Sequence, residues 1–278
     1  LQTMGKRFTK KKRKKKTSII IIVLEIVLLL VAIFFLLKIV PKNNDSDVVL
    51  FSKCSIIENL MAESELNSDQ LILVNKEHAV PDNYDADLVS FGNNKQKANS
   101  MIISPMNTMV SDAKAKGYVL NVVSAYRSNE LQQKLIDQDY QEYIDKGYSK
   151  EEALKNTYDY LMPPGYSEHH TGLALDILCD ENEEMDATQA NEAGNKWMLQ
   201  NCTKYGFILR YPKGFEDITG CKYEPWHLRY VGTPVAEFIT SNNITFEDFV
   251  EILQADKSQS AVLLAKIIRG AAITAINK

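Results

Sequence analysis

The positions of the histidines limit the folds open to this chain more than any other feature. Three of the four histidines lie in two short runs far apart in the sequence, residues 167–176 (SEHHTGLALD) and residues 224–227 (EPWH). The candidate metal ligands in these runs are His169, Asp176 and His227, and Glu224 is a further carboxylate. A catalytic zinc site needs three protein ligands, an open position for water and a base. A fold that builds such a site must bring both runs together.

The spacing of the first run requires a bend. His169 and Asp176 are seven residues apart, which would put them on opposite faces of a straight strand. Gly172 lies between them, where a glycine permits the backbone angles of a bend or bulge. In the second run, the proline after Glu224 favours extended geometry, so Glu224 and His227 need not share a helical face. Glu224 could then take a proton from an attacking water instead of binding the metal.

The charge of the chain is divided unevenly. Residues 1–18 contain nine of the 32 lysines and arginines and no acidic residue, so 23 basic residues face 36 acidic ones in the remainder. The acidic body argues against a nucleic-acid partner. The basic arm alone could be a nucleic-acid tail, but its position before an apolar run favours another interpretation.

Residues 19–37 follow the arm directly and are apolar except for Glu25. At about 1.5 Å per residue this run can cross a hydrocarbon core of about 30 Å. The basic flank predicts that the arm stays in the cytoplasm. We expect an uncleaved, single-pass anchor in the cytoplasmic membrane, with the folded domain on the extracellular side. A cleaved signal peptide is the alternative, but residues 38–41 offer no small-residue cleavage site.

Four cysteines are present: Cys54, Cys179, Cys202 and Cys221. An even number in a chain expected outside the cell permits disulfides, and the sequence does not choose a pairing. No C-x-x-C spacing supports a metal site built from cysteines. Structural or idle thiols are therefore the better interpretation.

The order of the expected elements favours an α+β fold with an antiparallel sheet and flanking helices, since no regular βαβ rhythm is present. Strands are expected at residues 71–74, 118–126, 173–178, 206–211 and 227–231. Helices are expected at residues 104–116, from 127 through 136, at 149–161, 188–205, 234–239 and 245–253. Ser149 and Glu152 form a capping box at the start of the third helix.

These patterns divide the chain into five parts. They are a basic cytoplasmic arm (1–18), a transmembrane signal anchor (19–37), a linker with a short helix (38–70), a folded domain (71–253) and a tail (254–278). The tail is expected to be an amphipathic helix that either lies on the membrane surface or packs onto the domain.

Four motifs make residues 71–253 resemble the VanY-type D-alanyl-D-alanine carboxypeptidases, zinc peptidases of the bacterial cell wall. The motifs are residues 124–128 (SAYRS) with Gln132, residues 164–176, residues 206–212 (GFILRYP) and residues 224–232 (EPWHLRYVG). The resemblance implies a zinc D,D-peptidase fold of the hedgehog-like type. It also implies that one zinc ion is bound by His169, Asp176 and His227.

The resemblance further implies that Glu224 is the catalytic base, that Arg127 engages the substrate carbonyl or carboxylate, and that Ser167 and Gln132 bind substrate. His170 stands where family members commonly have glutamine, so His169 and His170 compete as the ligand. The register of the motif favours His169. Ala125 replaces a common glycine and is expected to stiffen the turn before Arg127.

We therefore expect a monomeric, membrane-anchored zinc D,D-carboxypeptidase of bacteria that hydrolyses the terminal D-Ala-D-Ala bond of peptidoglycan stem peptides. An L,D-carboxypeptidase acting on tetrapeptide stems is the alternative within the same class. A non-catalytic, zinc-containing wall-binding module is a second alternative, against which the intact Glu224 and Arg127 argue. A membrane-bound structural protein has only the anchor and the tail to support it.

Overall fold

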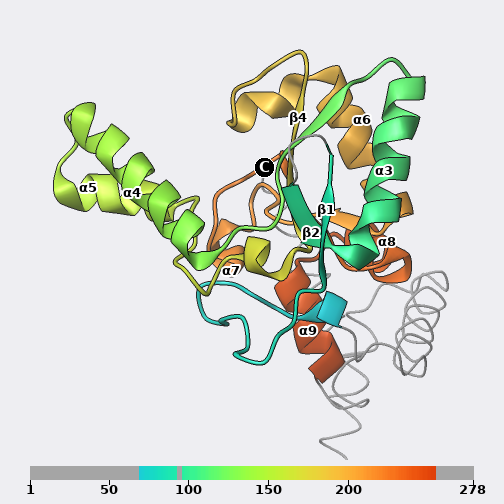
Figure 1. The fold of residues 1–278 in the computed structure, drawn as a ribbon, viewed down its shortest axis with the longest axis horizontal. Helices are drawn as coiled ribbons and strands as arrows, with labels where there is room; N and C mark the ends of the chain where they lie inside the picture. The colour runs from blue at the N-terminus through green and yellow to red at the C-terminus, as the bar shows by residue number, and fades with distance from the viewer. Residues whose placement is uncertain (1–68, 93–95, 255–278) are drawn as a thin grey trace, which may run out of the picture. The chain divides into compact units, whose positions relative to one another are not determined.

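The computed structural model describes residues 69–92 and 96–254, and every element below lies in these ranges. Figure 1 shows the fold of the described residues, with β4 near its centre. The central sheet has four antiparallel strands in the order β3-β4-β6-β5. These strands are β3 (Leu120–Ser124), β4 (Ala174–Cys179), β5 (Phe207–Leu209) and β6 (His227–Tyr230). A separate antiparallel pair consists of β1 (Leu88–Phe91) and β2 (Gln96–Asn99). The α+β class with an antiparallel sheet is thereby confirmed.

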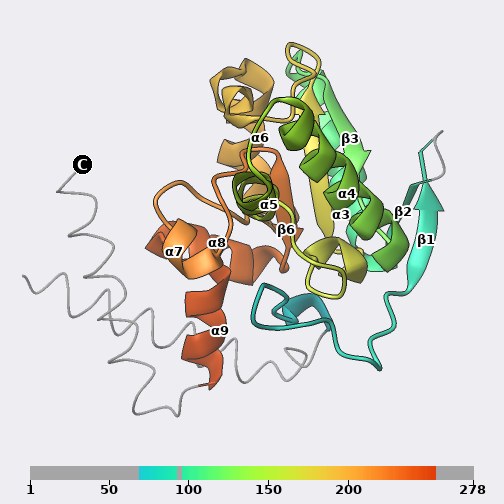
Figure 2. The same ribbon diagram turned by 90° about the vertical axis from the view of Figure 1, so that its left-hand side faces the viewer.

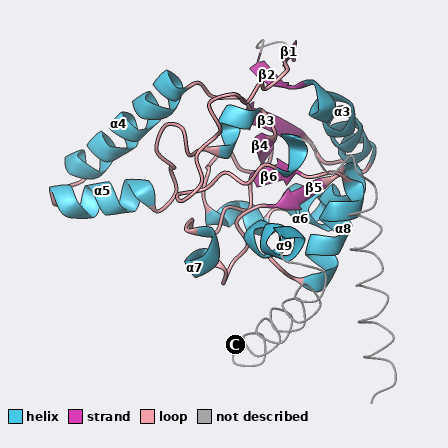
Figure 3. Cartoon of the chain, turned by 90° about the horizontal axis from the view of Figure 1, so that it is seen from below, coloured by secondary structure: helices cyan, strands magenta, loops and turns pink. Residues whose placement is uncertain are grey.

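Seven α-helices surround the sheet in the described part of the chain. They are α3 (Ser100–Ala115), α4 (Asn129–Asp145), α5 (Lys150–Tyr158), α6 (Ala193–Asn201), α7 (Glu216–Thr219), α8 (Thr233–Asn242) and α9 (Phe246–Gln254). Short 3-10 helices lie at Asp69–Leu71, Glu168–Thr171, Ala187–Asn191 and Cys202–Tyr205. Figures 2 and 3 show the β1–β2 pair near one end of the sheet and α7, α8 and α9 near the other.

Strand β4 connects the hydrophobic core with the opposite face of the sheet. All six of its residues are buried. Leu175 and Ile177 pack with Ile102 and Met106 of α3 in the main core. Because successive side chains of a strand alternate, Asp176 points to the other face. That face is the one from which the α4–α5 hairpin extends (Figure 3).

A second hydrophobic cluster covers the far edge of the sheet. Ile208 of β5 packs there against residues of α8 and α9, among them Phe238 and Phe249. The main cluster includes residues of all four strands, whereas the second cluster packs α8 and α9 against the β5 edge.

Several expected elements are confirmed, with shifted ends. Ser149 and Glu152 form the predicted capping box at α5. Helix α3 begins at Ser100 rather than at residue 104, because the Asn99 side chain accepts a hydrogen bond from the backbone of Met101 and caps the helix there.

Two expected elements are wrong. Residues 71–74 do not form a strand, because the guanidinium of Arg229 binds the backbone carbonyls of Gln70 and Ile72 that a strand partner would need. The single helix expected at 188–205 is divided into two 3-10 turns and α6. The β1–β2 pair was not expected.

The predicted membrane localisation is contradicted. Within residues 69–92 and 96–254 no helix is long and apolar enough to cross a bilayer. The longest, α4, has 17 residues, spans about 25 Å and carries polar and charged side chains over most of its surface. The predicted basic arm and anchor, the linker up to residue 68 and the tail from residue 255 lie outside the described residues, and the domain boundaries stay predictions.

The cysteines of the described part form no disulfide bonds with one another. Cys179, Cys202 and Cys221 are buried and free. Cys54 lies outside the described residues.

Candidate metal centre

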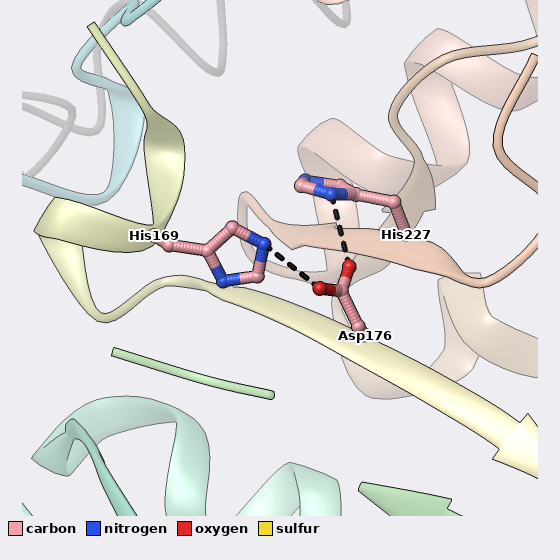
Figure 4. A group of neighbouring side chains, drawn as sticks. All are labelled: His169, Asp176 and His227. Atoms are coloured by element: carbon pink, nitrogen blue, oxygen red, sulfur yellow. Dashed lines mark ion pairs between the residues drawn. The ribbon is translucent and has the colours of Figure 1, made fainter. Parts of the chain in front are cut away.

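The imidazole rings of His169 and His227 and the carboxylate of Asp176 point toward one another (Figure 4). His169 Nε2 lies 3.2 Å from Asp176 Oδ2, and His227 Nδ1 lies 3.2 Å from Asp176 Oδ1. One ligand atom from each residue lies within 4.8 Å of the other two, and all three residues are buried. His170 is not in this cluster, since its Nδ1 faces the carbonyl oxygen of Arg127 at 2.7 Å. The geometry therefore favours His169 over His170 as a ligand.

The bend expected between His169 and Asp176 is present. His169 lies on the 3-10 helix Glu168–Thr171, which ends at Gly172 in the left-handed conformation with φ of 70°. A Cβ atom at Gly172 would come within 2.7 Å of the backbone nitrogen of Asn99. Glycine is thus required both for the turn and for the close approach to β2.

The register of the sheet places the other ligand candidates side by side. Asp176 pairs with His227 of β6 on one side and with Ser124 of β3 on the other. Side chains directly opposite each other on neighbouring strands have Cβ atoms about 5 Å apart. The central position of β4 therefore brings Asp176 next to His227.

Buried atoms without partners indicate that a cation fits between these residues. His169 Nε2 and Asp176 Oδ1 are buried and have no hydrogen-bond partner. Such atoms are rare in folded proteins and are commonly explained by an ion or an ordered water. Two imidazole nitrogens and a carboxylate oxygen are a donor set that zinc accepts.

The charges around the two imidazoles differ. Burial and the Arg127 guanidinium lower the pKa of His169 to about 4, so this ring is neutral at neutral pH. Burial also lowers the pKa of His227, but Asp176 and two nearby glutamates outweigh it and raise that pKa well above its ordinary value. The negative charge gathered around His227 favours a cation at this point.

Glu224 lies beside the ligand cluster. Its Oε2 is 3.3 Å from His227 Nδ1, and its Oε1 accepts a hydrogen bond of 3.5 Å from Cys221 Sγ. Burial raises the pKa of the Glu224 carboxyl above its ordinary value. A carboxyl with a raised pKa is suited to accept and release a proton near neutral pH.

Arg127 and Gln132 form a connected pair next to the cluster. The Arg127 guanidinium donates to Asp176 Oδ2 through Nη2 and to Ser124 Oγ at 2.8 Å through Nε. Gln132 Oε1 accepts from Arg127 Nη1 at 3.5 Å, and Gln132 Nε2 donates to the Met162 carbonyl at 2.7 Å. The amide of Gln132 is therefore engaged within the protein and holds the start of α4 beside the chain at Met162.

A cavity of about 500 Å³ opens onto the cluster. All seven residues predicted for the site line it, Ser167 and Gln132 included. Helix α4 contributes Asp139 and Tyr143, and the ring of Tyr211 packs on His227 with centroids 4.8 Å apart. A volume of this size accommodates the end of a peptide.

Three buried charged residues near the cluster were not predicted. Glu168 Oε1 accepts from Arg210 Nε at 2.7 Å and from Arg229 Nη1 at 2.8 Å. Burial raises the pKa of the Glu168 carboxyl, but the two guanidinium groups outweigh it and hold the pKa well below its ordinary value. The sequence signal for this group is an arginine inside each of two apolar runs, since a charged residue there must be buried and paired.

Comparisons with known proteins show which proteins this chain resembles. The family model for VanY, described as D-alanyl-D-alanine carboxypeptidase, matches residues 95–233. The putative carboxypeptidase YodJ of Bacillus subtilis (strain 168) is 43% identical over 191 residues, which cover 65% of this chain and 67% of that protein. A D-alanyl-D-alanine carboxypeptidase of Enterococcus faecalis (strain ATCC 700802 / V583) is 34% identical, with 69% of this chain and 71% of the relative covered.

The chain is also similar to several solved protein structures. A mutant of the vancomycin-resistance D,D-pentapeptidase VanY from a VanB-type cassette, in complex with Zn(II), has 33% identity and a TM-score of 0.60, covering 66% of this chain and 99% of that chain. VanYB in complex with D-alanine-D-alanine also has 33% identity and a TM-score of 0.60, with coverages of 66% and 98%. The LD-carboxypeptidase LdcB has 38% identity and a TM-score of 0.56, with coverages of 66% and 86%.

Proposed function

Because the chain belongs to the VanY family of D-alanyl-D-alanine carboxypeptidases, we propose that it is a zinc carboxypeptidase that hydrolyses the terminal D-Ala-D-Ala bond of peptidoglycan stem peptides. The observation that carries the proposal is the meeting of His169, Asp176 and His227 beside Glu224 in one cavity. We propose that the enzyme acts as a monomer.

His169, Asp176 and His227 would hold one zinc ion per chain, as their buried and unpaired atoms suggest. A bound zinc ion polarises the peptide carbonyl as a Lewis acid and lowers the pKa of water to about 7. The complex of a related VanY with Zn(II) supports the choice of metal.

Glu224 would move the proton in this reaction. Its carboxylate accepts the proton of the attacking water and passes it to the nitrogen of the departing D-alanine. The position of Glu224 Oε2, 3.3 Å from His227 Nδ1, puts the acceptor next to the ligand cluster. Its burial keeps bulk water from competing for the proton.

Arg127 would stabilise the negative charge that develops on the carbonyl oxygen, or bind the terminal carboxylate of the substrate. A guanidinium donates in a fixed fork, which suits either oxygen group. Its bond to Ser124 Oγ holds this fork at the cavity wall. Ser167 and Gln132 would contribute to substrate binding from the same wall.

The D,D specificity is favoured over the L,D alternative. A curated relative is a D-alanyl-D-alanine carboxypeptidase, and another is a bifunctional D-Ala-D-Ala dipeptidase and carboxypeptidase, VanXYC of Enterococcus gallinarum. The complex of VanYB with D-alanine-D-alanine supports the same substrate class. A binding module without turnover is disfavoured because it has no use for Glu224 beside the cluster.

The proposal is tested by incubating the purified protein with pentapeptide and tetrapeptide stems and weighing the products. We expect the pentapeptide to lose one D-alanine, a chelator to stop the reaction and added zinc to restore it. Faster cleavage of the tetrapeptide would point to the L,D alternative. Turnover of neither peptide by the zinc-loaded protein would refute the function.

A further inference from the structure

Glu168 is held in place by two buried arginines. Its side chain is 0% exposed, as are those of Arg210 and Arg229. Both arginines donate to the same oxygen, Oε1, at 2.7 Å and 2.8 Å. Arg210 is tied in turn to Glu247 of α9, and Arg229 to backbone carbonyls at Gln70 and Ile72. The direction of the Glu168 carboxylate is thereby fixed.

The second oxygen of Glu168 faces a ligand candidate. Glu168 Oε2 lies 3.6 Å from His227 Nε2, just beyond hydrogen-bond distance. Both atoms are buried, and neither has a hydrogen-bond partner. A small rotation of the His227 ring would join them and satisfy both.

His169 shows why this contact matters. A neutral imidazole carries one N–H, and the nitrogen without it offers the lone pair that binds a metal. His169 Nδ1 faces the carbonyl oxygen of Ala125 at 2.6 Å, which places the hydrogen on Nδ1 and leaves Nε2 free toward Asp176.

In His227 the two ring nitrogens have exchanged positions relative to His169, because Nδ1 is the atom that faces Asp176. Its hydrogen must therefore be on Nε2, and an acceptor is needed there. We propose that Glu168 is a positioning residue that accepts the Nε2–H of His227 and so presents the Nδ1 lone pair to the metal. The inference rests on the proposed zinc site. It goes beyond that site by assigning a task to a residue that does not touch the metal.

The wild-type protein provides the first test, through the ring nitrogens of its histidines. In the zinc-loaded full chain labelled with ¹⁵N, long-range ¹H–¹⁵N spectra should show the Nε2–H form for His227 and the Nδ1–H form for His169. An Nδ1–H form for His227 would overturn the inference while leaving zinc binding intact. A wild-type chain that binds no zinc would overturn the proposed function as well.

The second test compares Glu168→Gln with Glu247→Gln. Arginines are donors only, so the amide oxygen of a glutamine at 168 must turn to Arg210 and Arg229. Its NH₂ group would then face His227 Nε2 and favour the wrong tautomer. We expect zinc affinity, measured by chelator competition, to fall about ten- to hundredfold.

Glu247→Gln is the matched control, because it removes a carboxylate from the same Arg210 without a contact to His227. Its zinc affinity should remain close to that of the wild type. Equal losses in both variants, or no loss at Glu168→Gln, would overturn the inference. Circular dichroism checks the fold, and if Glu168→Gln does not fold, the wild-type spectra decide.

Discussion

At the scale of single residues, the function of the site depends on which atom of each side chain faces the cluster. His169, Asp176 and His227 could be predicted, because their types and motif positions are read directly from the sequence. Which ring nitrogen of each histidine faces Asp176, Nε2 in His169 and Nδ1 in His227, could not be predicted. Ring orientation depends on contacts with other segments, such as that of His169 with the carbonyl of Ala125. The contact between Cys221 Sγ and Glu224 Oε1 could not be predicted from the sequence either.

Glu224→Gln keeps the shape of the side chain and removes the proton acceptor. We expect kcat to fall about 10²- to 10⁴-fold. Zinc content should not change, because Glu224 lies outside the cluster of three ligand candidates. Release of D-alanine and atomic spectroscopy measure the two quantities, with the exposed Glu237→Gln as control. Full activity in Glu224→Gln would remove it from the mechanism, and loss of zinc would make it a ligand.

The buried thiols should resist modification in the folded protein. Burial raises the pKa of Cys179 and of Cys202 to about 12. Burial and the nearby Glu224 also raise the pKa of Cys221 well above its ordinary value. Since the thiolate is the reactive form, it becomes abundant only as the pH approaches these pKa values.

The experiment titrates the Cys54→Ser variant with Ellman's reagent at a mildly alkaline pH. We expect no reaction in buffer and modification of the remaining cysteines in guanidinium chloride. Rapid modification of the native protein would show that these cysteines are accessible.

At the scale of elements, the sequence predicted those features that depend on contacts between residues close together in the chain. The capping box of α5 depends on residues three positions apart and was predicted. The strand expected at 71–74 failed because Arg229, far along the chain, binds the carbonyls of this segment. The β1–β2 pair was missed because the polar residues of β2 (QKAN) carry a weak strand signal.

The bend at Gly172 is the element on which the first half of the site depends. Gly172→Ala adds a Cβ atom at φ of 70°, 2.7 Å from the backbone nitrogen of Asn99. Gly147→Ala is the matched control, since its φ is also positive, at 90°, and nothing lies within 4 Å of its Cβ. We expect Gly147→Ala to lower the free energy of unfolding by about 1–2 kcal/mol.

Gly172→Ala should lower the free energy of unfolding further, because the backbone of Asn99 cannot move aside as a flexible side chain could. It should also weaken zinc binding, because the 3-10 helix that carries His169 ends at this residue. Urea denaturation and chelator competition measure the two effects. Equal stability of the two variants would show that the close approach to Asn99 costs nothing.

At the scale of the whole molecule, the mixture of elements predicted the α+β class but not the strand order β3-β4-β6-β5. That order joins segments far apart in the sequence, and it places Asp176 between Ser124 and His227. The cavity is likewise a property of the whole fold, because α4 supplies one wall and the loops around Tyr160 and Met185 supply others. The membrane localisation was inferred from the apolar run and its basic flank, and it is contradicted because no helix of the described residues is long and apolar enough to cross a bilayer.

Removal of the metal should affect the whole domain, because its three ligand candidates lie on separate segments: the turn before β4, β4 itself and β6. Free zinc at about a thousand times its dissociation constant would add about 4 kcal/mol to the free energy of unfolding. We therefore expect a chelator to lower Tm by roughly 10 °C, with recovery on adding zinc. Scanning calorimetry of the full chain measures this. Asp176→Ala is the control in which the chelator should have little effect, and an unchanged Tm in the wild type would argue against a metal bridging these segments.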